Sequence, residues 1–388
     1  MKRQILYCLI IMLLYSCNTE NKNTDNAIVT FDIMEKYPQK TIDINDIADV
    51  EYIVPQSKDS FLFTNFVYLS NNHIIAFNYF EWNFVFFDKK GNPISNITRN
   101  GQGPEEYIMP LWIQLYDENN DDFFIVTLPN KMQVYDHEGN YKRTLQLRGD
   151  SLHLSVDAIY NYDDEYILCH DNNPSENYPF YLISKQTGFI KNIDLCNISK
   201  IDMSKIEVKQ GGKFRSISAN ASYSVKNKTG TILNLYSSDT IFYLSKDLKI
   251  NPFFIRTPSI HTMENPIFLT GFIETNKYLF FSTEEFDYSF DNKSMEKGFI
   301  LDKRSNTFYE VSIENRDYKG QDLIVSPIKM TSLVKSECSP NPHIGVRALP
   351  LEKLKISLDK NKLAGKLREL VLSSSDDDQF LLMIMKFH

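Results

Sequence analysis

The sequence lacks the short motifs that mark the commonest catalytic sites. Its 7 histidines include no His-x-His or His-Glu-x-x-His spacing, and it contains no Gly-x-Ser-x-Gly segment. The first absence removes the usual sequence signal of catalytic zinc, and the second removes the nucleophile turn of many serine hydrolases. We therefore assign no catalytic residue, no metal ligand and no cofactor from the sequence.

An excess of positive charge is also absent. The chain carries 42 Lys and Arg against 50 Asp and Glu, which gives a formal net charge of -8. A protein that binds nucleic acid needs a basic surface to displace the counterions of the phosphates. We therefore exclude nucleic acid as a partner, and we attribute the acidity to solubility.

Cysteine is scarce and widely spaced. Two of the 5 cysteines, Cys8 and Cys17, belong to the N-terminal apolar segment, which leaves Cys169, Cys196 and Cys338 without any Cys-x-x-Cys pair. An odd number at such spacings indicates neither a disulfide framework nor a zinc site. We interpret these three residues as small buried hydrophobic side chains.

The longest N-terminal apolar run is too short to cross a bilayer. Lys2 and Arg3 precede the run Ile5–Tyr15, roughly half the length that a spanning helix needs. The run leads into Leu14-Tyr15-Ser16-Cys17, which resembles a bacterial lipobox with Cys17 as the lipidated residue. Several acyl chains on one cysteine would anchor the protein firmly. The alternative is an ordinary secretory leader with an incidental cysteine.

These features predict how the chain is divided. We expect residues 1–17 to be a signal peptide, residues 18–40 a flexible polar tether, and residues 41–388 the folded domain. Asn18, rather than Asp, follows Cys17, which favours the outer membrane of a Gram-negative bacterium over the inner membrane. The membrane is thus an expected partner, through the lipid anchor.

A hairpin pattern recurs along the folded part of the chain. Each copy has two apolar residues, then Asp or Ser, then a basic residue or His, and then a polar turn. The apolar pair would end a buried strand, the Asp or Ser could cap the amides of the turn, and a glycine tolerates positive φ. The copies are Phe86–Lys89, Val134–His137, Leu182–Lys185, Tyr243–Lys246 and Ile300–Lys303, with turn glycines Gly91, Gly139 and Gly188.

This recurrence predicts an all-β fold, a six-bladed β-propeller of four-stranded blades. Roughly four short strands fall in each repeat of about 40–60 residues, which is typical of propeller blades. Five blades are readable, and the sixth would combine Leu323–Met330, the C-terminal run Phe380–Phe387 and the strand before Pro55. Strands from both termini would then close the ring. One C-terminal helix is expected over Leu351–Leu372, and Thr331–Leu349 fits no strand pattern.

Together these segments resemble the bacterial six-bladed β-propeller lipoproteins related to NHL-repeat proteins. The resemblance rests on the lipobox, the hairpins, the loop Gly101–Tyr107 (Gly-Gln-Gly-Pro-Glu-Glu-Tyr), and the acidic turn Asp376–Asp378 before the last strand. It covers nearly all of the mature chain. It implies the propeller fold and an envelope location, but no settled activity.

The propeller geometry also predicts a ligand-binding rim. Loops between the second and third strands should open on the same face as the links between blades, which brings together Tyr79–Trp82, Arg99–Tyr107, His170–Asn177 and Glu284–Lys297. Aromatic and polar side chains of this kind suit a glycan or a peptide. The alternative is that Gly101-x-Gly103-Pro104 is only a tight turn between blades. The candidate ligand-binding residues are Trp82, Arg99, Glu106, Tyr107, His170 and Asp171.

The sequence therefore favours a non-enzymatic binding or scaffold propeller, with possible protein partners in an envelope complex. The competing hypothesis is a metal-dependent propeller hydrolase or lyase with calcium or zinc on the axis. Such a site would need carboxylates or histidines from the inner strands of several blades.

Overall fold

The structure is a computed structural model. It describes residues 28–58, 61–108, 110, 114–127, 131–149, 156–171, 178–195, 206–210, 213–217, 222–227, 229–264, 266–285, 295–322, 341 and 343–388. The predicted signal peptide, Cys17 and the segment Leu323–Met330 lie outside the described residues, as do Cys196 and Cys338.

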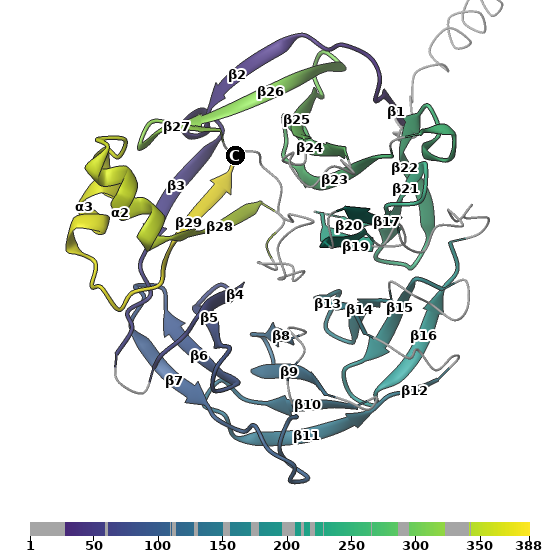
Figure 1. Cartoon of the computed structure of the whole chain (residues 1–388). Coiled ribbons are helices and arrows are strands. Elements are labelled where there is room, and N and C mark those ends of the chain that lie inside the picture. Colours follow the sequence, from purple (N-terminus) through teal and green to yellow (C-terminus); the bar gives the residue numbers. More distant parts are fainter. Residues whose placement is uncertain are drawn as a thin grey trace, which may run out of the picture.

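Six sheets surround a common centre, which confirms the six-bladed propeller (Figure 1). Blade one contains β4 (Asn65–Leu69), β5 (His73–Asn78), β6 (Asn83–Asp88) and β7 (Pro93–Ile97). Blade two contains β8 (Gln114–Asp117), β9 (Asp122–Thr127), β10 (Lys131–Tyr135) and β11 (Tyr141–Gln146). Blade three contains β13 (Ala158–Asn161), β14 (Tyr166–His170), β15 (Phe180–Ser184) and β16 (Phe189–Ile193), with β12 (Arg148–Gly149) added at its edge.

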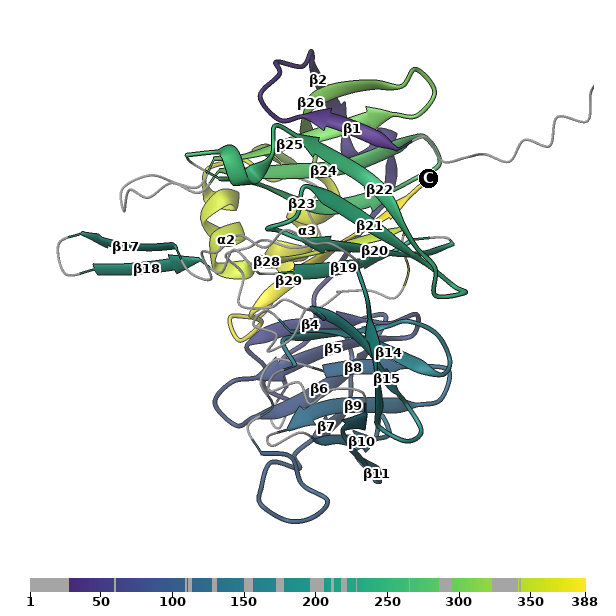
Figure 2. The same ribbon diagram turned by 90° about the vertical axis from the view of Figure 1, so that its right-hand side faces the viewer.

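The next two blades also have four consecutive antiparallel strands. Blade four contains β19 (Ser222–Lys226), β20 (Gly230–Leu235), β21 (Thr240–Ser245) and β22 (Ile250–Thr257), followed by the 3-10 turn Ile260–Thr262. Blade five contains β23 (Ile267–Glu274), β24 (Tyr278–Glu285), β25 (Met295–Asp302) and β26 (Thr307–Asn315), and β27 (Tyr318–Asp322) pairs with β26. A separate hairpin of β17 (Ile206–Gln210) and β18 (Lys213–Ile217) projects from the ring (Figure 2).

The recurring hairpin ends the third strand of each of the first five blades, as the sequence predicts. In blade one the apolar pair Phe86 and Phe87 is fully buried. The Asp88 carboxylate accepts hydrogen bonds from the backbone amides of Lys90, at 2.8 Å, and Asn92, at 2.9 Å. The capping function that we assigned to this position is therefore confirmed.

The basic residue after the cap has a function that the sequence did not reveal. In blades one, three and five, this lysine side chain crosses to the turn between the first two strands of the same blade and donates a hydrogen bond to a carbonyl there. Lys89 Nζ lies 2.7 Å from Ser70 O, and Lys303 Nζ lies 2.8 Å from Thr275 O. The repeated lysine therefore joins two turns of one blade.

The turn glycines also hold neighbouring blades together. Gly91 has a φ of 84°, and a Cβ placed on it would lie 2.4 Å from the carbonyl oxygen of Val54, just beyond the outer strand of the preceding blade. Gly188 has a φ of 70°, and a Cβ placed on it would lie 2.6 Å from the carbonyl oxygen of Gln146 in the preceding blade. Glycine is needed here both for the positive φ and for the close approach of two backbones.

The N-terminal segment runs along the outside of the ring before it enters a blade. β1 (Val29–Asp32) pairs in parallel with β22 of blade four, and β2 (Gln39–Asp43) pairs in parallel with β26 of blade five. Phe31 is completely buried there. The tether predicted over residues 18–40 therefore cannot extend to residue 40, because its last part belongs to two blade edges.

Strands from both ends of the chain close the ring, as predicted. After the 3-10 turn Ile44–Asp46, β3 (Ala48–Ile53) pairs with β29 (Phe380–Phe387), which pairs with β28 (Ile344–Pro350). β28 lies largely in the stretch where we expected no strand. The expected single helix is two helices, α2 (Leu351–Asp359) and α3 (Gly365–Ser373), at the outer edge of blade six (Figure 1). They separate at Asn361 and Gly365, both of which have positive φ.

Among the described residues, none of the helices is both long and apolar enough to span a bilayer.

Candidate functional site

Two of the predicted rim loops lie in contact. We call residues 79–82, between β5 and β6, the aromatic corner, and residues 99–107, between β7 and β8, the link. The Tyr107 hydroxyl of the link lies 2.8 Å from the carbonyl oxygen of Trp82 in the aromatic corner. Most of the loops of blades three and five that we expected on the same rim, residues 172–177 and 286–294, lie outside the described residues.

The link is a tight turn held by its own side chains. The Glu106 carboxylate accepts a hydrogen bond from the amide of Gly103 at 2.8 Å. Backbone bonds from Tyr107 N to Arg99 O and from Gly101 N to Tyr107 O, both 3.0 Å, close its ends. A Cβ on Gly101 would lie 1.9 Å from a Glu106 carboxylate oxygen, so the glycine leaves room for that side chain. The motif Gly-x-Gly-Pro-x-Glu-Tyr is thus explained by the structure of the turn.

The third strand of blade two holds the link in place. Gln133 Nε2 donates to the carbonyl oxygens of Pro104, at 3.0 Å, and Glu106, at 3.1 Å. The Tyr135 hydroxyl donates to the carbonyl oxygen of Glu105 at 2.7 Å. These bonds satisfy carbonyls that an isolated loop would leave to water. The link therefore joins blade one to blade two.

Tyr107, a predicted ligand-binding residue, is completely buried. Its hydroxyl is within hydrogen-bonding distance of the carbonyl oxygens of Trp82 and, at 2.9 Å, Ile97. Desolvation by burial raises its pKa well above the usual range of a tyrosine. Its side chain exposes no surface to a ligand in this structure, and the Glu106 carboxylate is bonded inside the link. The assignment of both residues to ligand binding stays a prediction.

His170 and Asp171 are also buried, with 0% and 1% of their surface exposed. His170 ends β14, and its Nε2 lies 3.0 Å from the hydroxyl of Tyr160 on the neighbouring strand β13. The Asp171 amide donates to Pro179 O at 3.0 Å across the base of its loop. Neither side chain lies on the molecular surface in this structure, and their assignment as ligand contacts stays a prediction.

Arg99 and Trp82 remain near the surface. Arg99 Nε donates to the carbonyl oxygen of Gly139 at 3.2 Å, so its guanidinium reaches the turn of blade two. Trp82 has a φ of 57° and is half-buried, with its ring against Phe77 and Tyr79. Trp82 thus packs the base of the aromatic corner, and part of its ring stays accessible.

The most exposed aromatic side chains of the corner are two that we did not select. Phe80 is 83% exposed and Tyr79 is 47% exposed. The backbone beneath them is fixed, because Asn78 Oδ1 accepts from Phe80 N at 3.0 Å and Thr64 Oγ1 accepts from Tyr79 N at 3.0 Å. The sequence contained a signal for their exposure, because Tyr79 and Phe80 stand directly before the charged Glu81 in a turn between two strands.

In the part of the chain that the structure describes, no three His, Cys, Asp or Glu side chains come together in a way that could hold a metal ion. The buried Lys185–Asp117 pair, with 2.6 Å between Nζ and Oδ2, is bonded to Asn161 Oδ1 as well and joins blades two and three. It therefore serves the interior of the protein.

The comparisons with known proteins agree with this architecture. A family model described as Domain of unknown function (DUF4934) matches residues 28–386. The chain belongs to this DUF4934 family. No curated protein matches it.

Among solved structures, the chain is similar to a Bacteroides fragilis NCTC 9343 protein whose name describes it as exported. The two share 17% sequence identity with a TM-score of 0.60, over 93% of this chain and 99% of the other. It is also similar to the periplasmic gluconolactonase PpgL of Pseudomonas aeruginosa, with 9% identity and a TM-score of 0.36 over 65% of this chain and 74% of the other. A Bacteroides caccae protein of unknown function gives 8% identity and a TM-score of 0.33, over 64% and 81%. The first similarity supports the propeller fold of this DUF4934 chain.

Proposed function

We propose that this protein is a lipid-anchored, non-enzymatic binding propeller of the cell envelope that holds a glycan against its aromatic corner. The observation that carries the proposal is the exposure of Phe80 and Tyr79, at 83% and 47%, on a corner fixed by hydrogen bonds. Exposed aromatic rings cost hydrophobic free energy unless a partner covers them. A rigid backbone beneath them lowers the entropy that binding would cost.

A glycan fits this surface better than a peptide does. The apolar face of a sugar ring can stack on Phe80 or Tyr79, while its hydroxyl groups need neighbouring hydrogen-bonding partners. Glu81, an exposed residue of the corner itself, is such a partner. A peptide would instead be expected to use an apolar groove, or to add a strand to a sheet edge.

The envelope location is supported by the leader and by one relative. Lys2 and Arg3, the apolar run and Cys17 together resemble a lipoprotein signal, and the similar Bacteroides fragilis protein is described as exported. We infer anchoring to the outer membrane through Cys17, as in the NHL-like propeller lipoproteins. Replacing Cys17→Ser should abolish the incorporation of labelled fatty acid and release the protein from the membrane fraction. Unchanged labelling would overturn the anchor.

The binding proposal is tested with a glycan array and calorimetry on the purified chain without residues 1–17. Phe80→Ala and Tyr79→Ala should each weaken glycan binding by about fivefold, because an aromatic contact contributes on the order of 1 kcal/mol. Phe189→Ala, which removes a ring that is 47% exposed on β16, is the matched control and should have no effect. Glycan binding that survives both corner variants, or binding of peptides alone, would contradict the proposal.

A further inference from the structure

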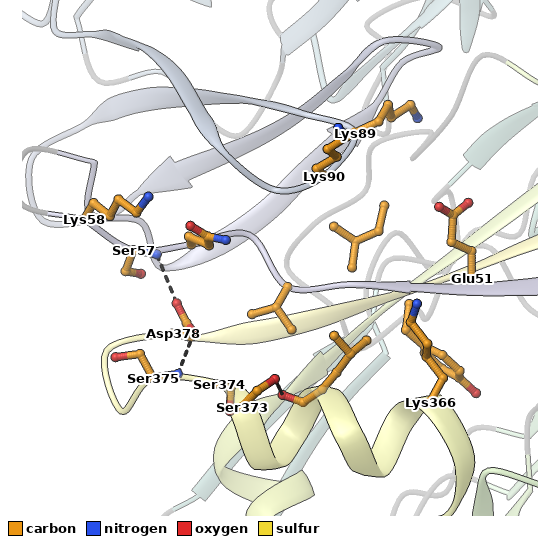
Figure 3. A pocket seen from close by; sticks show the side chains of 15 residues that line it. Glu51, Ser57, Lys58, Lys89, Lys90, Lys366, Ser373, Ser374, Ser375 and Asp378 are labelled. Atoms are coloured by element: carbon orange, nitrogen blue, oxygen red, sulfur yellow. Dashed lines mark hydrogen bonds between the residues drawn. The ribbon is translucent and has the colours of Figure 1, made fainter.

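A hollow of about 470 Å³ lies where the ring closes, between blades six and one. We call this place the closing seam. The end of β3 and the segment after it form one wall, the turn between β6 and β7 forms another, and α3 with the segment after it forms the third (Figure 3). The volume lies in the range of small-molecule sites. The hollow shares no residue with the aromatic corner.

Lysines from three separate segments surround this hollow. They are Lys58 after β3, Lys89 and Lys90 in the turn, and Lys366 on α3, and Figure 3 shows them around the hollow, with Ser373–Ser375 and Asp378 at the end of α3 and after it. This gathering is notable in a chain with a net charge of -8. Bringing like charges together raises the free energy unless an anion compensates them.

The two acidic residues of the lining do not supply that compensation. Glu51 forms an ion pair with Lys386, with 3.0 Å between Oε2 and Nζ. Asp378 accepts backbone hydrogen bonds from Ser57 N, at 3.1 Å, and Ser375 N, at 2.9 Å. Asp378 thereby joins the N-terminal segment to the segment after α3, and both carboxylates are used within the protein.

Three of the four lysine amines are left available. Lys58, Lys90 and Lys366 are exposed, and their amines make no hydrogen bond or ion pair with another residue that the structure describes. Lys89 differs, because its amine donates to Ser70 O at 2.7 Å and burial lowers its pKa to about 8. The positive charge open to a ligand therefore comes mainly from the three exposed amines.

The turn itself does not require Lys90. The corresponding position of the other hairpins holds Glu138, Gln186, Asp247 or Arg304, so the fold accepts either charge there. Among the described residues, only the closing seam has helices beside such a turn. The hairpin repeat therefore does not explain why lysines gather beside α3 at this seam.

We propose that this hollow binds a small organic molecule that carries two or more phosphate, sulfate or carboxylate groups. Two or more groups are expected because the lysines come from three separate segments around the hollow. Ile53, Val54 and Leu370 also line the hollow and provide an apolar surface for the carbon skeleton of the ligand. Nothing in this inference depends on the glycan site.

The test is calorimetric titration of the purified chain at low salt with four probes. They are pyrophosphate, a disulfated disaccharide, trigalacturonate and the neutral sugar maltotriose, so that the arms separate phosphate, sulfate and carboxylate ligands from uncharged ones. At least one charged probe should bind, more weakly as the salt concentration rises, because salt screens exposed charges. Maltotriose should not bind at this site.

Variants then locate the site. Lys58→Ala, Lys90→Ala and Lys366→Ala should each weaken binding of the charged probe by about threefold, and together by more than tenfold, as expected for exposed ion pairs. Arg304→Ala is the matched control, since Arg304 occupies the place of Lys90 in blade five, away from the hollow. Unchanged affinity in the triple variant, or an equal loss in Arg304→Ala, would overturn the proposal.

A second readout uses the unmodified chain and does not depend on how the variants fold. Acetylation of surface lysines, followed by mass spectrometry, should show that the charged probe protects Lys58, Lys90 and Lys366. Lys353, which is exposed on α2, should react equally with and without the probe. Equal protection of all four lysines, or of none, would refute the site.

Discussion

The link and the closing seam both join successive blades, but they use their polar groups in opposite ways. In the link, the Glu106 carboxylate and the Tyr107 hydroxyl are bonded within the protein. At the closing seam, the acids are bonded within the protein while Lys58, Lys90 and Lys366 point to solvent.

This difference teaches where to look for binding in a propeller. The link has the most recognisable motif of the chain, yet its glycines, glutamate and tyrosine are explained by one turn and its anchoring to blade two. The closing seam has no sequence motif, because its lining comes from both ends of the chain and from one turn between them. A recognisable local motif thus indicates a local structure such as a turn, whereas charged side chains without a protein partner indicate where a ligand could bind.

The largest effect is expected from Gly91→Ala at the closing seam. The new Cβ would have to adopt a φ of 84° and would lie 2.4 Å from the carbonyl oxygen of Val54, so two backbones must separate. We expect a loss of about 3 kcal/mol or more in the free energy of unfolding. Gly320→Ala is the control, because its φ is 74° but no atom lies within 4 Å, and it should cost only about 1 kcal/mol. Urea denaturation measures both, and equal losses would show that the seam can open without cost.

A smaller effect is expected from Tyr107→Phe in the link. The substitution keeps the buried ring but leaves the carbonyl oxygens of Trp82 and Ile97 without their donor. We expect a loss of about 1–2 kcal/mol in the free energy of unfolding, as for other buried hydrogen bonds. Binding at the aromatic corner should stay within about twofold of the unmodified protein if Tyr107 has only a structural function. A large loss of affinity with unchanged stability would instead show that Tyr107 is a ligand contact.

The smallest effect concerns pH and Lys89. Burial lowers the pKa of Lys89 to about 8 from 10.5, so between these values the unfolded chain binds more protons at this group than the folded chain does. Stability must therefore rise with pH in that window, and Lys89 contributes no pH dependence below it. Lys89→Met removes the amine, and the stability difference between the two proteins should change only between about pH 8 and pH 10.5. A constant difference across this range, measured by urea denaturation, would show that Lys89 titrates normally.

Much of the fold could be predicted because short sequence patterns that recur along the chain determine it. The pair Phe86–Phe87, the cap Asp88 and the turn glycine Gly91 recur often enough to count blades. The terminal strand Phe380–Phe387 is apolar along nearly its whole length, and this run predicted that the C-terminus supplies a buried strand to close the ring.

The remaining elements depend on contacts that no local pattern encodes. β1 and β2 are short and pair in parallel with strands more than half the chain away, and β28 carries Gly345 and ends at Pro350. The burial of two predicted site residues also depends on contacts that no local pattern encodes. Tyr107 and His170 have residue types that suit ligands, but both are buried. The Tyr107 hydroxyl lies against the carbonyl oxygens of Trp82 and Ile97 in blade one, and His170 lies against Tyr160 on the neighbouring strand of its own blade.

The path of the N-terminal segment has a mechanical consequence. Because β1 lies on blade four, β2 on blade five and β3 in blade six, tension applied upstream of Ile28 acts first on β1, two blades away from the strand pair β3–β29 that seals the ring. β1 and then β2 would have to peel away before any load reached β3. When the chain is pulled from its N-terminus, β1 and β2 therefore detach first, and the ring of blades stays closed.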